Sequence, residues 1–176
     1  MKTRRTQTVV AYWLIPAEPE RELFAEIIRI LAKQFDAPRF EPHVTLFAVS
    51  PDRQSAAKVL HQISASPIRL RIRDVSYSTK FTETLFLRFK SNKALQKLVV
   101  DLARVMKSRP RAVCAPHISF LYKKLPTATK KVLAATIKLP FREVVFDSIK
   151  AVRCALPTRT RAEVKAWCVI ASNRLR

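Results

Sequence analysis

The sequence predicts an α+β protein with two sheet-forming lobes, helices on the outer faces and a central groove between the lobes. Strand-like and helix-like segments follow the order β-α-β-α-β-β and then α-β-α-β-β, which divides the chain into two halves. Each half carries a short histidine motif, EPHVTLF at 41–47 and APHISFL at 115–121. A length of 176 residues, 48% of them hydrophobic, suits one core, so we expect a single two-lobed, pseudo-symmetric domain over residues 1–176.

Hydrophobic periodicity indicates the elements of the first half. An apolar, β-branched run that ends at Pro16 is typical of a buried strand, and the next segment places leucine, isoleucine and phenylalanine at helical spacing. Ser50 is the expected N-cap of a second helix, and the alternation in IRLRIR predicts a strand with a basic outer face. These patterns place strands at 6–15, 43–49, 68–78 and 84–90, and helices at 19–35 and 50–63.

The second half begins with an amphipathic segment for which Ser91 or Asn92 provides the N-cap. Runs rich in β-branched and aromatic residues then predict strands, one of which carries the second histidine motif. The expected elements are helices at 91–107 and 126–137, and strands at 111–122, 141–156 and 161–172.

The chain is strongly basic, with 34 lysine and arginine residues against 13 acidic ones, a formal net charge of +21 and a pI near 10.9. This charge favours binding to RNA or other phosphate-bearing ligands, although it also serves solubility. No apolar run approaches the roughly 18 residues of a membrane helix, and no cleavage site follows the basic start. We therefore expect a cytoplasmic protein that does not bind a membrane, with its three cysteines as free thiols.

Glycine is absent from the sequence, although an average chain of this length contains about a dozen. Its absence excludes the glycine-dependent nucleotide motifs, such as the P-loop and the dinucleotide-binding fingerprint. We hypothesise that the sequence was recoded to a reduced alphabet, and a natural glycine-free coding sequence would contradict this. Backbone strain is expected wherever a turn needs positive φ.

Two of the three histidines lie in the matching motifs, 74 positions apart. Because residues i and i+2 of a strand share a face, His43 should point the same way as Thr45, and His117 the same way as Ser119. Each motif thus offers one imidazole and one hydroxyl to the groove. The simpler alternative is that both histidines are ordinary strand residues bonded to neighbouring backbone groups.

Two imidazoles on opposite sides of a groove suit in-line displacement at phosphorus. A neutral imidazole takes a proton from the attacking water while a protonated one gives a proton to the departing oxygen. An unperturbed pKa of about 6.5 permits both roles near neutrality. Hydroxyls of the two motifs would donate to the non-bridging phosphate oxygens. The motifs are poor in carboxylates, so we expect neither a metal nor another cofactor.

The two H-x-S/T tetrads resemble those of the 2H phosphoesterase superfamily. Within it, the chain looks most like the cyclic phosphodiesterases that act on nucleoside 2′,3′-cyclic phosphates and ADP-ribose 1″,2″-cyclic phosphate. Further stretches carry this resemblance in order along almost the whole chain: YWLIP, FDAPRFEPHVTL, FTETLFLRF, APHISFLY and VKAW. The resemblance implies two lobes, each built on a small antiparallel sheet, around a central groove.

Carried over to this sequence, the resemblance implies His43 and His117 as the catalytic pair, with Thr45 and Ser119 as phosphate ligands. It suggests His117 as the base that activates water and His43 as the acid, so that the ring opens to a 2′-phosphate. The residues alone do not assign these two roles, because the roles exchange with the ester bond that breaks.

Two aromatic residues extend the expected substrate site. Tyr122 completes an H-x-S-x-x-Y run and is a candidate for contact with the phosphate or the base, although strand parity places it off the catalytic face. Trp13, in YWLIP, is a candidate for stacking or for lining the groove, and a core position is the alternative.

Together, the motifs and the resemblance imply a monomeric, metal-independent enzyme of RNA metabolism that hydrolyses cyclic-phosphate nucleotides, including a by-product of tRNA splicing, to 2′-phosphates. One alternative is an RNA 2′,3′-cyclic phosphodiesterase that acts on RNA ends, which the basic surface would suit. The other is a basic RNA-binding domain that keeps the fold without the catalysis.

Overall fold

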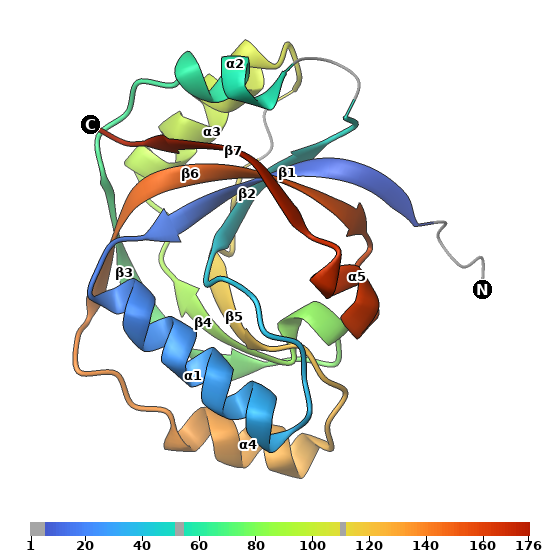
Figure 1. Cartoon of the computed structure of the whole chain (residues 1–176). Helices are drawn as coiled ribbons and strands as arrows, with labels where there is room; N and C mark the ends of the chain where they lie inside the picture. The colour runs from blue at the N-terminus through green and yellow to red at the C-terminus, as the bar shows by residue number, and fades with distance from the viewer. Residues whose placement is uncertain (1–5, 52–54, 110–111) are drawn as a thin grey trace.

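A computed structural model describes residues 6–51, 55–109 and 112–176 (Figure 1). This part of the chain contains seven strands, five α-helices and one short 3-10 helix. The strands are β1 (Gln7–Pro16), β2 (Val44–Val49), β3 (Ile68–Tyr77), β4 (Leu85–Phe89), β5 (His117–Leu121), β6 (Glu143–Leu156) and β7 (Cys168–Arg174). The helices are α1 (Glu20–Gln34), α2 (Ala56–His61), η1 (Phe81–Glu83), α3 (Lys93–Val105), α4 (Thr127–Thr136) and α5 (Arg161–Lys165).

All paired strands are antiparallel, in the order β2-β1-β6-β3-β4-β5, with β7 added on β6. The two histidine motifs lie at the two ends of this order, one at the start of β2 and the other in β5. The long strand β6 joins the halves, because its first residues pair with β3 and its later residues pair with β1 and β7. The α+β fold with antiparallel sheets is confirmed, whereas its extent as one domain over 1–176 stays a prediction.

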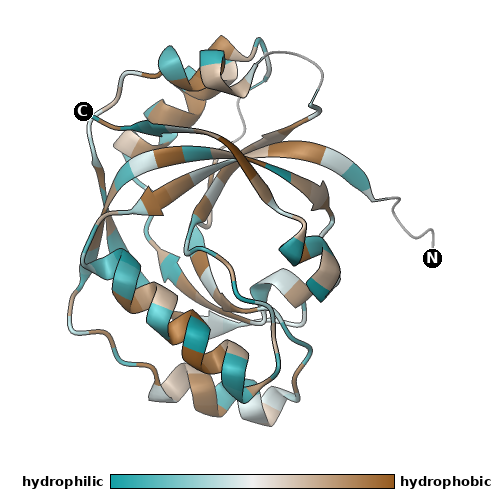
Figure 2. Cartoon of the chain, viewed as in Figure 1, coloured by the Kyte–Doolittle hydropathy of each residue, from teal (hydrophilic) through white to brown (hydrophobic). Residues whose placement is uncertain are grey.

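The helices lie outside the sheet. In Figure 1, α1 and α4 lie at one end of the molecule, and α2 and α3 lie at the other. Contacts agree with this arrangement, since α1 and α4 pack on strands of the β3-β4-β5 half and α2 packs on β6 and β7. Figure 2 shows hydrophobic residues along the crossing strands and a mixture of both kinds on the helices, as expected for helices with one buried face.

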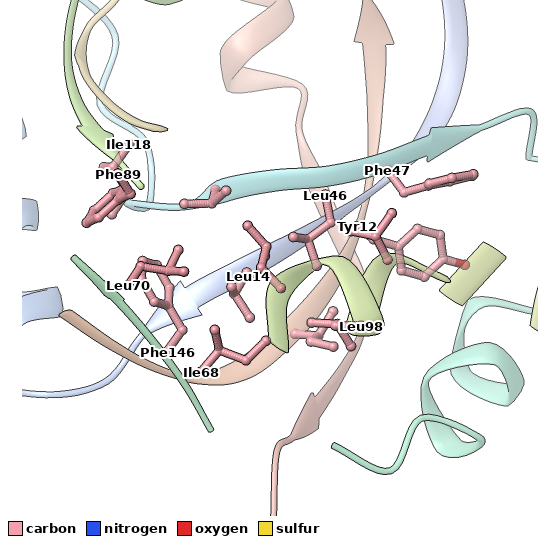
Figure 3. Packing of buried hydrophobic residues seen from close by; sticks show 14 of the residues in the cluster. Tyr12, Leu14, Leu46, Phe47, Ile68, Leu70, Phe89, Leu98, Ile118 and Phe146 are labelled. Carbon is pink, nitrogen blue, oxygen red and sulfur yellow. The ribbon is translucent and has the colours of Figure 1, made fainter. Parts of the chain in front are cut away.

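Strand β1 is buried on both faces, which explains its unbroken apolar sequence. One face joins the main core, where residues of β1, β2 and α3 converge (Figure 3). The other face forms a smaller cluster with β6 and Trp167. The residues on the main-core face are Val10, Tyr12 and Leu14, and those on the other face are Val9, Ala11, Trp13 and Ile15.

The prediction of one strand over 161–172 is wrong. The first part of this segment is α5, and β7 begins only at Cys168. A capping box starts the helix: the Glu163 amide donates to the Thr160 hydroxyl, and the Glu163 carboxylate accepts from the Thr160 amide. These local hydrogen bonds outweigh the strand preference of the flanking residues.

Both motif strands begin later than predicted. Strand β2 begins at Val44 and β5 begins at His117. His43 therefore directly precedes its strand, and His117 is the first residue of its strand. The preceding proline has no N–H to donate to a ladder, which suits a strand start.

The second helix is shorter than the predicted 50–63 and follows Ser55, so Ser50 is not its cap. Residues 52–54 of that prediction lie outside the described residues. Between β3 and β4, the sequence analysis missed the short helix η1, which reaches the site described below.

The described residues with positive φ are Asp36, at 47°, and Lys107, at 50°. They follow α1 and α3 at the position where glycine usually ends a helix. A residue with a Cβ pays roughly 1 kcal/mol there relative to glycine. The turn nevertheless forms in both places, with amide-to-carbonyl bonds of 2.9 Å from Ala37 to Ala32 and from Ser108 to Ala103.

Candidate active site

A cavity of about 190 Å³ is lined by both histidine motifs. Its lining includes residues of β1, β2, η1, β5 and β6 and of the segments that follow β5, β6 and α5. The structure thus brings together all six residues that the sequence analysis selected: Trp13, His43, Thr45, His117, Ser119 and Tyr122. The other lining residues are Ala11, Thr82, Glu83, Cys154, Leu156, Thr158 and Trp167.

The two imidazoles are held in the same way. Nδ1 of His43 lies 2.7 Å from the carbonyl oxygen of Glu41, and Nδ1 of His117 lies 3.0 Å from that of Ala115. In each motif the acceptor is two residues earlier, across the proline. A neutral ring that donates through Nδ1 keeps Nε2 as an acceptor, so the nitrogen left for a ligand is Nε2 in both cases.

His43 lies inside an aromatic cluster. Its ring stacks on Trp13 with a centroid distance of 3.7 Å and an interplanar angle of 10°. The rings of Trp167 and Phe40 lie nearly perpendicular to it, with centroid distances of 5.9 and 6.4 Å. Only 7% of the His43 surface is exposed. These contacts fix the ring orientation and remove its solvent.

Burial lowers the pKa of His43 to about 4, against a weaker opposite effect of its bond to the Glu41 carbonyl. A positive charge on His117 lowers that pKa further, so the two imidazoles are close enough to interact electrostatically. In the ligand-free protein at neutral pH, His43 is therefore uncharged.

His117 has a more open environment. It is partly exposed, and its ring contacts the edge of Phe86 at a centroid distance of 5.3 Å and an angle of 62°. No ring in the described residues stacks face to face on it, whereas His43 has the Trp13 stack.

The two motif hydroxyls also differ. Thr45 is exposed, and among the described residues its hydroxyl makes no hydrogen bond. Ser119 is buried and donates to the carbonyl oxygen of Thr82 in η1 at 2.6 Å. A phosphate oxygen would meet the Thr45 hydroxyl directly, but it must draw the Ser119 hydroxyl away from Thr82.

Tyr122 lies at the cavity despite the parity argument, because the chain has left β5 at Leu121 and strand alternation no longer applies. Its ring stacks on Phe40 at 4.0 Å and 12°. Burial raises the pKa of Tyr122 well above its ordinary value, and its hydrogen bond with Ser119 opposes this only partly. The phenol therefore stays protonated and can donate.

The sequence analysis missed Phe40 and Trp167 as members of the site. Trp167 closes the aromatic cluster edge-on to Trp13 at 5.1 Å, and its Nε1 is buried without a hydrogen-bond partner among the described residues. Both residues fall in stretches already noted in the sequence, FDAPRFEPHVTL and VKAW. The resemblance of these stretches to the family therefore pointed to both residues, but no local pattern indicated that their rings contact His43.

An ion pair secures the segment before His43. Lys150 of β6 donates to both carboxylate oxygens of Glu41, at 2.6 and 2.8 Å. Since the Glu41 carbonyl holds the His43 ring, this pair ties the imidazole to the centre of the sheet. Sequence reasoning did not find it, because the two residues are 109 positions apart.

Cys154 is the cysteine of the cavity lining, and burial raises its pKa to about 11. Its thiol is therefore protonated near neutrality and does not act as a nucleophile. Among the residues that the structure describes, no group of three or more His, Cys, Asp or Glu side chains is placed to hold a metal ion. Within the same residues, no helix is long and apolar enough to cross a membrane.

The sequence model of the 2′-5′ RNA ligase superfamily matches residues 15–155. This chain belongs to that superfamily. Membership confirms the resemblance to the 2H phosphoesterases that the two H-x-S/T tetrads indicated, and it supports a phosphoesterase activity.

Relatives of this superfamily member are distant in sequence. A cyclic phosphodiesterase of Arabidopsis thaliana is 24% identical over 126 residues, which cover 70% of each protein. Escherichia coli LigT in its apo form matches with a TM-score of 0.53 and 17% identity, covering 98% of this chain and 99% of LigT. LigT complexed with 3′-AMP gives 0.55 and 16%, covering 96% and 98%. A protein of Thermus thermophilus gives 0.56 and 17%, with the same coverage. At these identities, the solved structures show that the fold is shared.

Proposed function

We propose that this protein hydrolyses nucleoside 2′,3′-cyclic phosphates, and ADP-ribose 1″,2″-cyclic phosphate, to the 2′-phosphate and the 1″-phosphate without a metal ion. The observation that carries the proposal is the pair of imidazoles with backbone-bonded Nδ1 atoms that line one cavity with a hydroxyl from each motif. The name of the Arabidopsis relative, a cyclic phosphodiesterase, supports the same class of substrate.

The reaction is an in-line displacement on the cyclic phosphate. A water oxygen attacks phosphorus and gives its proton to one imidazole, while the bond between phosphorus and the 3′-oxygen breaks. The other imidazole gives its proton to that 3′-oxygen, which leaves a 2′-phosphate and a free 3′-hydroxyl. The two histidines then return to their starting protonation states through solvent.

Hydroxyl donors stabilise the charge that grows on the non-bridging oxygens. Thr45 is the more readily available donor, whereas Ser119 reaches the phosphate only after it releases the Thr82 carbonyl. Tyr122, protonated and adjacent to Ser119, supplies a third hydroxyl at the same end of the cavity. Trp13 contributes mainly through its stack on His43, so we assign it to positioning of that ring.

The direction of proton transfer depends on the charge state of His43. The resemblance gives His43 the acid role, yet burial makes His43 neutral in the ligand-free protein. A bound phosphate anion favours protonation of a neighbouring imidazole. The acid role therefore requires that substrate binding raises the pKa of His43, and proton uptake must then accompany binding.

The deciding experiment is hydrolysis of 2′,3′-cyclic AMP in the presence of EDTA, with the product identified by chromatography. We expect 2′-AMP at a rate that EDTA does not change. Loss of activity in EDTA that added Mg²⁺ or Zn²⁺ restores would contradict the metal-independent mechanism. Formation of 3′-AMP instead would show that the other ester bond breaks and that the two proton-transfer roles are exchanged.

A second candidate is hydrolysis of the same cyclic ester at the end of an RNA chain. The formal net charge of +21 favours it, because a polynucleotide offers many phosphates and a mononucleotide offers one. A basic RNA-binding domain without catalysis would instead bind RNA equally well after His43→Ala or His117→Ala. Rates of hydrolysis of mononucleotide and oligonucleotide substrates, measured for the wild-type protein and these two variants, distinguish the three functions.

A further inference from the structure

A second hollow, of about 520 Å³, has a strongly cationic lining. In the part of the chain that the structure describes, four cationic side chains and one carboxylate line it. They come from the C-terminal end of α1, the segment after it, and α5. The lining cations are Lys33, Arg39, Arg161 and Lys165, and the carboxylate is Asp36.

Three of the four lining cations form no ion pair with a described residue, and two of them, Lys165 and Arg39, also help to lower the pKa of Asp36 and of Glu26. Arg161 donates to the Asp36 carboxylate at 2.5 Å, and Lys123 donates to the Asp36 carbonyl oxygen at 3.2 Å. The pKa of Asp36 is lowered chiefly by Arg161, so this carboxylate stays ionised and Arg161 stays paired. The three remaining cations, Lys33, Arg39 and Lys165, make no ion pair or side-chain hydrogen bond with any described residue.

Residues that line the hollow adjoin aromatic residues of the catalytic site along the chain. Phe40 follows Arg39 and stacks on Tyr122, which lines the catalytic cavity. Trp167 comes two residues after Lys165, and its ring is 6.2 Å from that of Phe40. Arg39 and His43 are four residues apart, which limits their Cα separation to about 14 Å. Short stretches of chain that carry both cations and aromatic rings therefore connect the hollow with the catalytic cavity.

Unpaired cations beside aromatic rings are the features that bind single-stranded nucleic acid, where phosphates meet the charges and bases stack on the rings. A cyclic mononucleotide has its one phosphate between the two histidines and gives the hollow no ligand. An RNA chain with a cyclic-phosphate end carries further phosphodiesters on its 5′ side, within reach of a neighbouring subsite.

We propose that the hollow bounded by Lys33, Arg39 and Lys165 is a phosphate subsite for the nucleotides that precede the cyclic phosphate of an RNA end. The inference rests on the proposed hydrolysis of the cyclic ester and extends it to a polynucleotide substrate. Arg161, held by Asp36, forms the fixed side of the subsite, and the three unpaired cations neutralise the incoming phosphate.

The test combines a triple variant with two substrates. Lys33→Ala, Arg39→Ala and Lys165→Ala are introduced together, and kcat/KM is measured for 2′,3′-cyclic AMP and for a short RNA ending in a 2′,3′-cyclic phosphate. The triple variant is expected to lose at least about tenfold on the RNA and less than about twofold on the mononucleotide. An equal loss on both substrates, or none on the RNA, overturns the subsite.

The matched control removes the same charge far from the hollow. Lys58→Ala in α2 with Lys93→Ala in α3 and Arg174→Ala in β7 also deletes two lysines and one arginine, from exposed positions that form no ion pair with a described residue. A general effect of net charge would lower RNA hydrolysis equally in both triple variants, which would also overturn the proposal.

Binding without turnover separates the subsite from the proposed reaction. A fluorescent RNA with a 3′-phosphate end is titrated at several salt concentrations, and the dependence of log K on log salt is measured. Each neutralised phosphate of a single strand contributes about 0.7 to this slope, so loss of the one phosphate bound in the subsite should reduce it by about 0.7 relative to the control. If neither substrate is hydrolysed but this change appears, the proposed reaction fails and the subsite stands. An unchanged slope overturns the subsite alone.

Discussion

The two histidine motifs have nearly the same sequence and the same local hydrogen bond, yet they place their imidazoles in different surroundings. His43 is stacked on Trp13 and enclosed by Phe40 and Trp167, whereas His117 is partly exposed beside the edge of Phe86. The X-Pro-His backbone fixes ring orientation in both places, because Nδ1 bonds to the carbonyl two residues earlier. Charge state, in contrast, depends on residues that are distant in the chain.

The same contrast appears in the hydroxyls, with the positions reversed. In the first motif the histidine is enclosed and Thr45 is exposed, while in the second the histidine is accessible and Ser119 is buried against Thr82. A pseudo-symmetric strand order therefore produces an asymmetric cavity. Asymmetry is what a displacement reaction needs, since one side accepts a proton and the other donates one.

The largest expected effect comes from truncation of either imidazole. His43→Ala and His117→Ala should each lower kcat/KM for 2′,3′-cyclic AMP by at least about 10²-fold, because each removes one proton-transfer group. The two variants should also differ in their free energy of unfolding, measured by urea denaturation. His43→Ala leaves a void against Trp13 and should lower the free energy of unfolding by roughly 1–3 kcal/mol, and His117→Ala by less than about 0.5 kcal/mol. Equal losses of stability would show that the two environments do not differ.

The next effect is a pH dependence of stability that His43 confers. Its folded pKa of about 4 lies below its unfolded value near 6.5, so the unfolded state binds more protons between these two values. The stability that neutral His43 contributes is fully present above the pKa of this histidine in the unfolded chain. It is lost as the pH falls from that value toward 4. Between pH 7.5 and pH 5 the loss should be roughly 2 kcal/mol.

Glutamine substitutions isolate this contribution. His43→Gln should flatten the stability profile over this range, whereas His117→Gln should retain the slope. The measurement is urea unfolding at pH 7.5 and pH 5 for the wild-type protein and both variants. A slope that persists in His43→Gln would mean that another group titrates there.

The smallest expected effect comes from the ion pair between Lys150 and Glu41, which lies beside the first motif. Lys150→Met removes the ammonium that holds Glu41 but keeps most of the side-chain volume, so the His43 ring should lose part of its orientation. We expect kcat to fall by about three- to tenfold with KM nearly unchanged, and Lys150→Arg to restore most of it. A change confined to thermal stability would make the pair structural and remove Lys150 from the description of the site.

The sequence predicted the fold through residues whose signals are local. The alternation in IRLRIR, the apolar run of β1 and the helical spacing of α1 and α3 each correspond to an observed element. The prediction of a strand over 161–172 was wrong because a capping box between Thr160 and Glu163 begins a helix there, through two side-chain hydrogen bonds.

The sequence predicted residues that line one cavity, but it did not predict how deeply each of them is buried. Strand parity brought His43, Thr45, His117 and Ser119 to one cavity, but it misplaced Tyr122, which lies beyond the end of its strand. The burial of His43 could not be predicted, because it results from Trp13, Phe40 and Trp167, which come from three separate segments. Contacts of this kind depend on tertiary packing, which no periodicity encodes.

The strand order has a kinetic consequence. The two motifs stand at opposite ends of a path of six paired strands, so neither can meet the other until β1, β6, β3 and β4 have joined. Chains dominated by such non-local pairings fold slowly, since loop closure costs entropy before the contacts form. Turnover would then be the last property to return during refolding, later than the recovery of secondary structure. Under the proposed function, turnover reports on the completed sheet, and a fragment with a single motif is expected to be inactive.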